Sequence, residues 1–384
     1  MLQIDLIRDE AGFLALEHDW RALVDGSRVL TPFQTWEWVE AWWRHHGYGT
    51  PFVLVARDAG VVVGILPLVL GRYRGTPLRQ LRWMGAPLSD FQDFLAVDER
   101  RGEVAEALFT ALGQEQARWD FADLNDLRAD STLPRLGLPA ALRGTVNFHR
   151  KCPTITLEAT WDVYAKSLGK NMRANVGRRR RQIEKQFATK LETVSDPAAL
   201  PAAMTDLFAL HNARWQRRGA KGAFATPELQ AFHQEVARRF LERGWLRLHV
   251  MRCDGATKAA FYCFAFAGRV YYYLSGFDES IGKFSPGNVM MGFSLAEAMK
   301  EGAREFDLLR GDETYKYDWK ATDRDTERLV IGHGGLRSHL GTLGHRFERF
   351  VEVQGIKVQR RLWGRKKQPV KTEAAASVEG HASA

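Results

Sequence analysis

Apolar positions in the first half of the chain recur at spacings typical of helices and strands. Beyond Pro32, the residues Trp36, Val39 and Trp43 lie on one side of a helix. The turn residues Asp58-Ala59-Gly60 separate two apolar runs, which predicts a β-hairpin. The predicted elements of this half are strand 3–7, helix 12–23, the helix beyond Pro32, strands 52–57, 61–70, 81–84 and 94–97, and helix 103–119.

The second half shows the same plan on a larger scale, with helices first and a hairpin after them. Between 270 and 309 a strand, a turn, an amphipathic helix and a second strand follow one another. Such a crossover places the two strands parallel, with the helix packed across them. The predicted elements are helices 161–187, 201–218 and 227–243, strands 246–252, 258–267 and 270–274, helix 287–301 and strand 305–309.

The repeated order favours an internal duplication. A length of 384 residues is typical of about two domains. We therefore predict an α/β (α+β) protein of two tandem halves, each a mixed twisted sheet flanked by helices, with the boundary near 147–153. The expected domains are 1–150, 151–335, a basic C-terminal helix at 336–367 and a disordered tail at 368–384, where no apolar periodicity remains.

The composition is that of an ordinary globular protein, with 45% hydrophobic and 26% charged residues. Three cysteines without metal-ligand spacing predict neither a disulfide framework nor a zinc site, and we expect no bound metal. The N-terminus lacks a signal-peptide pattern, and the most apolar run, 61–70, is too short to span a bilayer. A cytoplasmic protein is expected, with peripheral attachment to the inner membrane as the alternative.

Positive charge is concentrated in two segments of this chain, whose net charge is +9. Residues 170–185 hold seven cations and one acid, Glu184, and a second cluster runs from Arg360 to Lys367. A solvated helix face explains such a run, and a grip on phosphate groups of a substrate is the functional interpretation.

The segment Ser285-Pro286-Gly287 has the composition of a helix start. Ser285 suits the capping position and Pro286 the first helical position, while Gly287 lets a ligand approach the backbone. The free N–H groups of such a start can hold a pyrophosphate, with Lys283 adding charge. The plain alternative is an ordinary helix cap. Position favours the functional interpretation, because the next strand ends in a polar cluster that cannot all be buried unused.

Several segments together resemble the GNAT superfamily of acyltransferases, in the CelD-type branch linked to cellulose and exopolysaccharide biosynthesis, which is similar in turn to FemAB transferases. The resemblance covers most of the chain. It rests on Phe33-Gln-Thr-Trp-Glu-Trp38, Trp42-Trp43, Gly64-Ile-Leu-Pro-Leu68, Ser89-Asp-Phe-Gln-Asp-Phe94, Arg173, Leu210-His-Asn-Ala-Arg-Trp215, Leu274-Ser-Gly276, Ser285-Pro-Gly287 and Arg310-Gly-Asp-Glu-Thr-Tyr-Lys-Tyr317.

The resemblance implies acetyl-CoA or a longer acyl-CoA as co-substrate, with pantetheine between two splayed strands and only the second half active. The acceptor amine would lose its proton to Asp312 or Glu313, because a free lysine-like amine has a pKa of about 10.4. Lys316 or a backbone N–H would stabilise the oxyanion, and Tyr315 or Tyr317 would protonate the thiolate. Ion pairs, caps and core tyrosines are the alternative roles of these residues.

Further residues are assigned to binding by the same resemblance. His211, on an apolar helix, also suits a packed and hydrogen-bonded histidine, and the aspartates also suit loop caps. The donor would lie on Leu274, Ser275, Gly276, Lys283, Ser285, Pro286, Gly287 and Asn288, and the acceptor on Asp90, Asp93, Arg173, His211, Arg214 and Trp215.

Three functions remain open at this point. The first is an N- or O-acyltransferase that moves an acyl group from CoA to a small-molecule or sugar amine or hydroxyl, in polysaccharide or envelope biosynthesis. The second is an aminoacyl-tRNA-dependent transferase, the one case in which nucleic acid is an expected partner. The third is a non-catalytic accessory protein of polysaccharide assembly. It would lie on an anionic membrane through 340–367, which holds eight cations and two acids.

Overall fold

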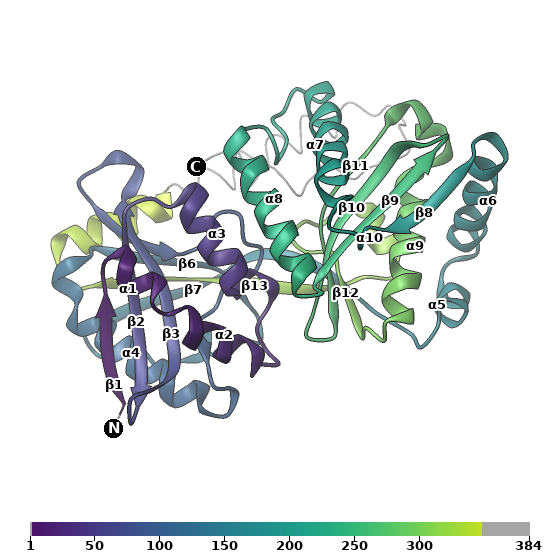
Figure 1. Cartoon of the computed structure of the whole chain (residues 1–384). Coiled ribbons are helices and arrows are strands. Elements are labelled where there is room, and N and C mark those ends of the chain that lie inside the picture. The colour runs from purple at the N-terminus through teal and green to yellow at the C-terminus, as the bar shows by residue number, and fades with distance from the viewer. Residues whose placement is uncertain (1, 348–384) are drawn as a thin grey trace. The chain divides into compact units, whose positions relative to one another are not determined.

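A computed structural model describes residues 2–347 and divides them into two units, shown in Figure 1. The first unit comprises 2–36, 47–149 and 325–347, and the second comprises 37–46 and 150–324. Each unit combines a mixed sheet with flanking helices, which confirms the predicted fold class. The units differ from the expected domains in two segments, since 37–46 joins the second unit and the residues from 325 join the first.

The sheet of the first unit has the strand order β1-β2-β3-β4-β6-β13-β7, with β5 paired to β3. The pairs β1–β2, β2–β3, β3–β4, β3–β5 and β6–β13 are antiparallel, whereas β4–β6 is parallel. The predicted hairpin is present, and Ala59 and Gly60 take the positive φ values that its tight turn requires. The strands are β1 (Gln3–Ile7), β2 (Thr50–Asp58), β3 (Val61–Arg72), β4 (Arg79–Trp83), β5 (Leu95–Ala96), β6 (Phe121–Arg128), β7 (Leu142–Thr156) and β13 (Thr322–His333).

Strands β6, β7 and β13 were not among the predicted elements, and their sequences explain why. In β6 the buried residues include Asp123 and Asp126, so the strand lacks an apolar pattern. In β7 residues 143–148 are exposed in succession, and consecutive buried residues appear only at 152–155. The boundary expected near 147–153 therefore falls inside a single strand.

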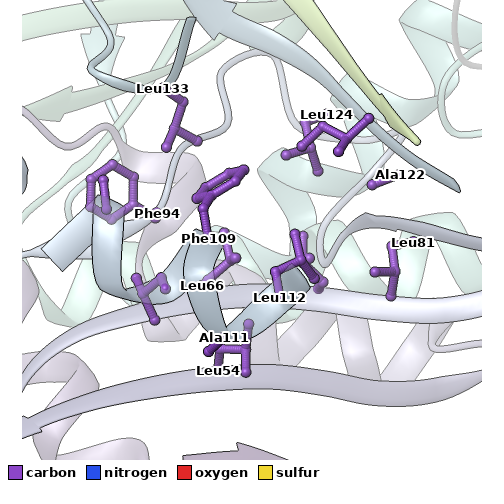
Figure 2. Close-up of a cluster of buried hydrophobic side chains, with 14 of the residues drawn as sticks. Leu54, Leu66, Leu81, Phe94, Phe109, Ala111, Leu112, Ala122, Leu124 and Leu133 are labelled. Atoms are coloured by element: carbon purple, nitrogen blue, oxygen red, sulfur yellow. The ribbon is translucent and has the colours of Figure 1, made fainter. Parts of the chain in front are cut away.

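The core of the first unit forms between helix α4 (Arg101–Gln114) and one face of the sheet. Figure 2 shows Phe109 and Leu112 of this helix among Leu54 and Leu66 of β2 and β3. The alternate residues of β2, such as Val53, are also fully buried, because α1 (Glu10–Leu14) and α2 (Glu17–Asp25) pack against β2 and β3. The single helix predicted over 12–23 is thus two helices, with Ala15 and Leu16 between them.

The second unit has the strand order β7-β12-β11-β10-β9-β8. The ladders are antiparallel except for the pair β11–β12. Besides β7, the strands are β8 (Thr189–Thr193), β9 (Leu246–Cys253), β10 (Ala256–Phe266), β11 (Arg269–Phe277) and β12 (Glu305–Asp307). The parallel β11–β12 pair confirms the predicted crossover, whereas the short, polar edge strand β8 was not predicted.

Helices cover both faces of this second sheet (Figure 1). Helix α9 packs against β9, β10 and β11, on the face that carries Phe261, Cys263 and Tyr272. Helices α7 and α8 contact the other face of the same sheet. Trp38 belongs to that other face, where its ring meets Phe232 and Tyr273. The helices are α3 (Trp36–His46), α5 (Trp161–Ser167), α6 (Lys170–Gln186), α7 (Leu200–Arg217), α8 (Pro227–Glu242), α9 (Pro286–Lys300) and α10 (Thr314–Asp318).

The helix predicted over 161–187 is interrupted in the structure. Leu168 has ψ 152° and Gly169 has ψ 141°, so two extended residues separate α5 from α6. Val176 and Ile183 are the buried residues of α6, and the cations of this helix lie on its other sides. The sequence run of cations is therefore a largely solvated face on a helix anchored by two apolar residues.

The C-terminal part of the first unit is helical at 336–347. The remainder of the predicted basic helix, 348–367, and the predicted tail, 368–384, lie outside the described residues. Ser338 and His345 are buried on one side of this helix, while Leu336, Leu340, Leu343 and Phe347 are exposed. Within 2–347 no helix combines the length and the apolar character that crossing a bilayer requires.

Candidate functional site

The β11–α9–β12 crossover leaves part of one strand edge open. The parallel ladder joins only Arg269–Tyr271 of β11 to Glu305–Asp307 of β12. Strand β11 continues for six more residues, to Phe277, while the chain beyond Asp307 turns away. This diverging pair is the arrangement in which an extended ligand can lie along a strand beyond the end of its ladder.

Helix α9 begins at this diverging end, directly after the 3₁₀ turn Glu279–Phe284. Pro286 occupies the first turn as predicted, but Ser285 does not cap the helix with its side chain. It has a left-handed backbone, with φ 53°, and its carbonyl accepts from the N–H groups of Asn288 and Val289. Ser285 therefore occupies the N-cap position as predicted, but its backbone carbonyl and not its side chain makes the capping hydrogen bonds.

Space around Gly287 remains open at this helix start. A Cβ atom placed there would find one neighbour within 4 Å, Cε1 of Phe277 at 3.9 Å. The Gly287 N–H has no acceptor in the described part of the chain. Lys283 is exposed, and its carbonyl accepts a bond from Arg179 of α6. The helix start thus presents a backbone donor and an exposed cation to solvent.

The loop after β12 is held by Lys316, whose side chain is buried. Its ammonium lies 3.4, 3.0 and 3.1 Å from the carbonyl oxygens of Leu309, Arg310 and Gly311. It also forms an ion pair with Glu313 at 2.9 Å. Because an ammonium has three N–H donors, the loop acceptors already use all of them. The role of Lys316 in oxyanion stabilisation stays a prediction, and the contacts seen here position the loop.

Asp312 and Glu313 differ in their surroundings. Asp312 is exposed, whereas Glu313 is buried against Lys316. Gly311, which lies between β12 and these two carboxylates, has φ 112°, and a Cβ atom there would lie 2.6 Å from a Glu313 oxygen. Only glycine allows this loop to close over the Glu313–Lys316 pair. Of the two proposed bases, Asp312 is therefore the exposed one.

The two candidate acids also lie in different environments. Burial raises the pKa of Tyr315, and Tyr272 and Glu313 raise it further. Tyr317 is 37% exposed and donates a hydrogen bond to Asp323 at 2.6 Å. Burial and the bond to Asp323 raise the pKa of Tyr317 as well. Both phenols therefore keep their protons near neutral pH, and Tyr315 is the one enclosed among other site residues.

His211 fixes helix α7 against the end of β11. Its Nδ1 lies 2.8 Å from the Ser275 carbonyl, and its Nε2 accepts the Ala223 N–H at 3.1 Å. Nδ1 is therefore the protonated nitrogen, and burial lowers the pKa of His211 to about 4. A Cβ on Gly276 would lie 2.6 Å from the backbone nitrogen of His211. His211 is thus a neutral, hydrogen-bonded histidine, which matches the packed alternative.

Arg214 lies one turn further along α7, with 4% of its surface exposed. Its guanidinium carbon stands 4.2 Å from the centre of the Phe277 ring. Desolvation by burial lowers the pKa of Arg214, and the charge of Arg218 acts in the same direction. In the described chain it forms no ion pair and no hydrogen bond through its side chain. Trp215 beside it is buried.

The structure brings most of the predicted second-half residues together around the end of β11. Leu274, Ser275 and Gly276 form that end, and Arg214, Tyr315 and the start of α9 surround it. Arg173 is exposed on α6. Asp90 and Asp93 lie in the first unit, where Asp93 pairs with Arg101 at 3.0 Å.

Two residues of this site were not predicted. Tyr272 donates a hydrogen bond to the Ser275 hydroxyl at 2.6 Å and lies close enough to Tyr315 to affect its pKa. Phe277 contacts both Arg214 and the Gly287 position. The signal available in the sequence was the aromatic density of the run Tyr271-Tyr272-Tyr273 followed by Phe277, which also suits a plain core strand.

Comparisons with known proteins agree with this geometry. Residues 170–317 match the family model described as the acetyltransferase (GNAT) domain. A crystal structure of FemX superposes with a TM-score of 0.60 and 12% identity, over 81% of this chain and 95% of that one. The C-terminal domain of a putative lysylphosphatidylglycerol synthetase from Agrobacterium fabrum superposes with a TM-score of 0.55 and 12% identity, over 86% of this chain and 95% of that one.

L-PGS from Bacillus licheniformis gives a TM-score of 0.50 with 10% identity, over 78% of this chain and 92% of that one. A search of curated proteins finds no match. The chain therefore has a GNAT-like fold with a segment that matches the acetyltransferase domain, as the resemblance implied. At these identities the structural likeness establishes the fold alone, and the CelD-type branch stays a prediction.

Proposed function

We propose that the protein is an acyltransferase that moves an acetyl or longer acyl group from CoA to an amine or hydroxyl acceptor. The observation that carries the proposal is the early end of the β11–β12 ladder beside the start of α9, inside the segment that matches the GNAT domain. Residues 272–277, where β11 extends beyond the parallel ladder, suit the amide groups of pantetheine, and the helix start suits a pyrophosphate.

The residues present fit such a donor. The Gly287 N–H is available, a side chain at 287 would meet only Phe277, and exposed Lys283 adds positive charge. A thioester bound here would supply the acyl group and a thiolate leaving group. Gly287 and Lys283 would hold the phosphates, and the 272–277 edge would orient the chain that carries the thioester.

Proton transfer falls to residues of the loop after β12. The exposed Asp312 carboxylate would accept the proton that the acceptor nitrogen loses as it attacks the thioester carbonyl. Tyr315 keeps its hydroxyl proton because burial raises its pKa, so it can protonate the departing thiolate. Lys316 would keep the loop carbonyls in place through its contacts with residues 309–311.

The acceptor is proposed to be a small molecule or sugar of polysaccharide or cell-envelope biosynthesis. The resemblance of the second-half motifs supports this assignment. So does the fold shared with a protein described as a putative lysylphosphatidylglycerol synthetase.

The donor is tested by thermal unfolding with and without acetyl-CoA, and by mass spectrometry of CoA species that co-purify. A ligand at 100 times its Kd should stabilise the native protein by about 2.7 kcal/mol. Gly287→Glu should abolish this gain by placing a carboxylate where phosphate binds. The matched control is Gly102→Glu. Gly102, like Gly287, is the second residue of a helix, and a Cβ atom placed there would have no neighbour within 4 Å. No stabilisation of the wild type by any CoA ester would refute the proposal.

An aminoacyl-tRNA donor is the second candidate, and the exposed cations of α6 favour it. Arg178, Arg180 and Arg181 lie on its solvated face, and Arg180 is paired only with Glu184 at 2.8 Å among described residues. If this face binds RNA, Arg178→Glu with Arg181→Glu should weaken binding and flatten its salt dependence. Equal binding by variant and wild type would leave α6 as a solvated helix.

A further inference from the structure

Arg214 differs from other largely buried arginines of the second unit. Arg239 pairs with Glu40 at 2.6 Å, and Arg269 pairs with Glu305 at 2.7 Å. Arg214 is 4% exposed, and no carboxylate of the described chain lies within ion-pair distance of it. Glu279, which acts on it electrostatically, is instead bound to Arg217 at 3.0 Å. A buried charge without an opposite charge costs several kcal/mol, so its presence needs a cause.

The surroundings of Arg214 do not supply a compensating charge. The face of Phe277 at 4.2 Å gives a cation–π contact, which contributes about 0.5–2 kcal/mol. Tyr272 and Tyr315 are neutral, because burial raises the pKa of both phenols. The same Phe277 ring borders Gly287, where the start of α9 adds the positive end of a helix dipole. Positive potential therefore converges on the end of β11 from two elements.

We infer that Arg214 binds an oxyanion, a phosphate or a carboxylate, of one of the enzyme's substrates. A guanidinium presents paired N–H donors that match the two oxygens of these groups. That the bound anion belongs to a substrate rests on the proposed acyltransferase function, whereas the anion site itself follows from burial and charge. Two sources share this chemistry: a phosphate of the CoA donor, and an anionic group on the acceptor.

The experiment compares wild type, Arg214→Met, Arg214→Lys and the control Arg218→Met. Arg218 is exposed at the C-cap of the same helix, so its removal tests for a general loss of positive charge. In the first arm, CoA is titrated into each protein. In the second arm, inorganic phosphate and succinate are titrated into protein saturated with CoA. Melting temperatures without any ligand are recorded for all four proteins.

Arg214→Met should melt at or above the wild-type temperature without ligand, because it removes a buried charge that has no partner. Its affinity should fall about 10- to 100-fold in one arm, the usual worth of hydrogen bonds to a charged group. A loss in the CoA arm identifies a donor phosphate, and a loss confined to the second arm identifies the acceptor's anion. Arg214→Lys keeps the charge without the paired donors and should show an intermediate loss.

Two results would overturn the inference. One is equal affinity of wild type and both Arg214 variants in both arms. The other is early melting of Arg214→Met together with wild-type affinities in Arg214→Lys, which would make the residue a packing element on Phe277. If CoA does not bind the wild type, the second arm is run without CoA. A loss there that depends on Arg214 supports the anion site, while the failure of CoA to bind the wild type refutes the CoA donor.

Discussion

Asp123 of the first unit and Arg214 of the second are both buried, but only Asp123 has an oppositely charged partner among the described residues. In the first unit Asp93, Asp120 and Asp123 each lie against an arginine, and Asp123 receives two bonds from Arg328 at 2.5 and 2.6 Å. In the second unit the buried Arg214 has no carboxylate among the described residues, and the α9 start has an N–H without an acceptor.

This difference separates charges that hold a fold from charges that await a ligand. A buried ion pair breaks at a high cost once one partner is removed, since the other charge stays behind. Removing a buried charge that already lacks a partner costs the folded protein little stability. The comparison therefore predicts that mutation of a paired buried charge such as Asp123 affects stability, and that mutation of Arg214 affects binding or turnover.

The largest effect should come from the chemistry of the second unit. Asp312→Asn keeps the shape of an exposed side chain and removes the proposed base. Turnover measured at saturating substrates should drop by roughly 10²–10⁴-fold, with the melting temperature nearly unchanged. A loss of only tens of per cent would end the assignment of Asp312 as the base and direct attention to Glu313.

The next effect concerns stability in the first unit. Arg328 holds the pKa of Asp123 well below its usual range, so Asp123→Asn leaves Arg328 buried with a weakened partner. Urea unfolding should show a loss of about 3–5 kcal/mol. The control is Glu184→Gln, which breaks an exposed pair with Arg180 and should cost less than about 0.5 kcal/mol. Similar small losses in both variants would show that Asp123 and Arg328 do not form a stabilising buried pair.

A smaller effect tests the packing that places α7 on β11. In Gly276→Ala the new methyl group would meet the His211 nitrogen at 2.6 Å and Cβ of Leu210 at 2.8 Å. Separating helix from strand should cost about 1–3 kcal/mol in urea unfolding and weaken anion binding by Arg214. Gly287→Ala adds the same methyl group in open space and should stay within about 0.5 kcal/mol of wild type.

The last effect is a pH dependence. Burial lowers the pKa of His211 to about 4, whereas an unfolded histidine titrates near 6.5. Between these values the unfolded chain binds more protons, so the stabilisation is complete above pH 6.5 and is lost as the pH falls toward 4. In His211→Gln the proton uptake on unfolding between pH 7 and 4.5 should decrease by up to one proton. Buried His249, with a pKa of about 3, retains part of the dependence. An unchanged slope would show that His211 does not titrate as described.

The sequence predicted those elements whose side chains alternate or repeat by themselves. Both hairpins and the β11–α9–β12 crossover follow from local patterns, and they were found. Strand β6 was not, since Asp123 is buried there only because Arg328 comes from a strand about 200 residues later. Local patterns could not predict the division into units either, because β6 pairs with the distant strand β13.

The sequence predicted which residues form the site better than it predicted what each of them does. Lys316 stands beside the candidate base in sequence, but its ammonium is directed to the loop carbonyls by the positive φ of Leu309 and Gly311. Arg214 was assigned to binding through resemblance alone. Its burial without a partner, which gives the assignment a physical basis, is a property of the folded chain.

The chain passes between its units at 36/37, 46/47, 149/150 and 324/325, which affects how the protein is made. During synthesis the N-terminal unit of a protein usually folds first. Here β13, which pairs with β6, leaves the ribosome only after residues 37–46 and 150–324 of the second unit. Until then one edge of β6 is uncovered, and open strand edges favour association with other chains. The unit that begins first therefore closes last, and its unfinished sheet has the longest exposure to misassembly on the ribosome.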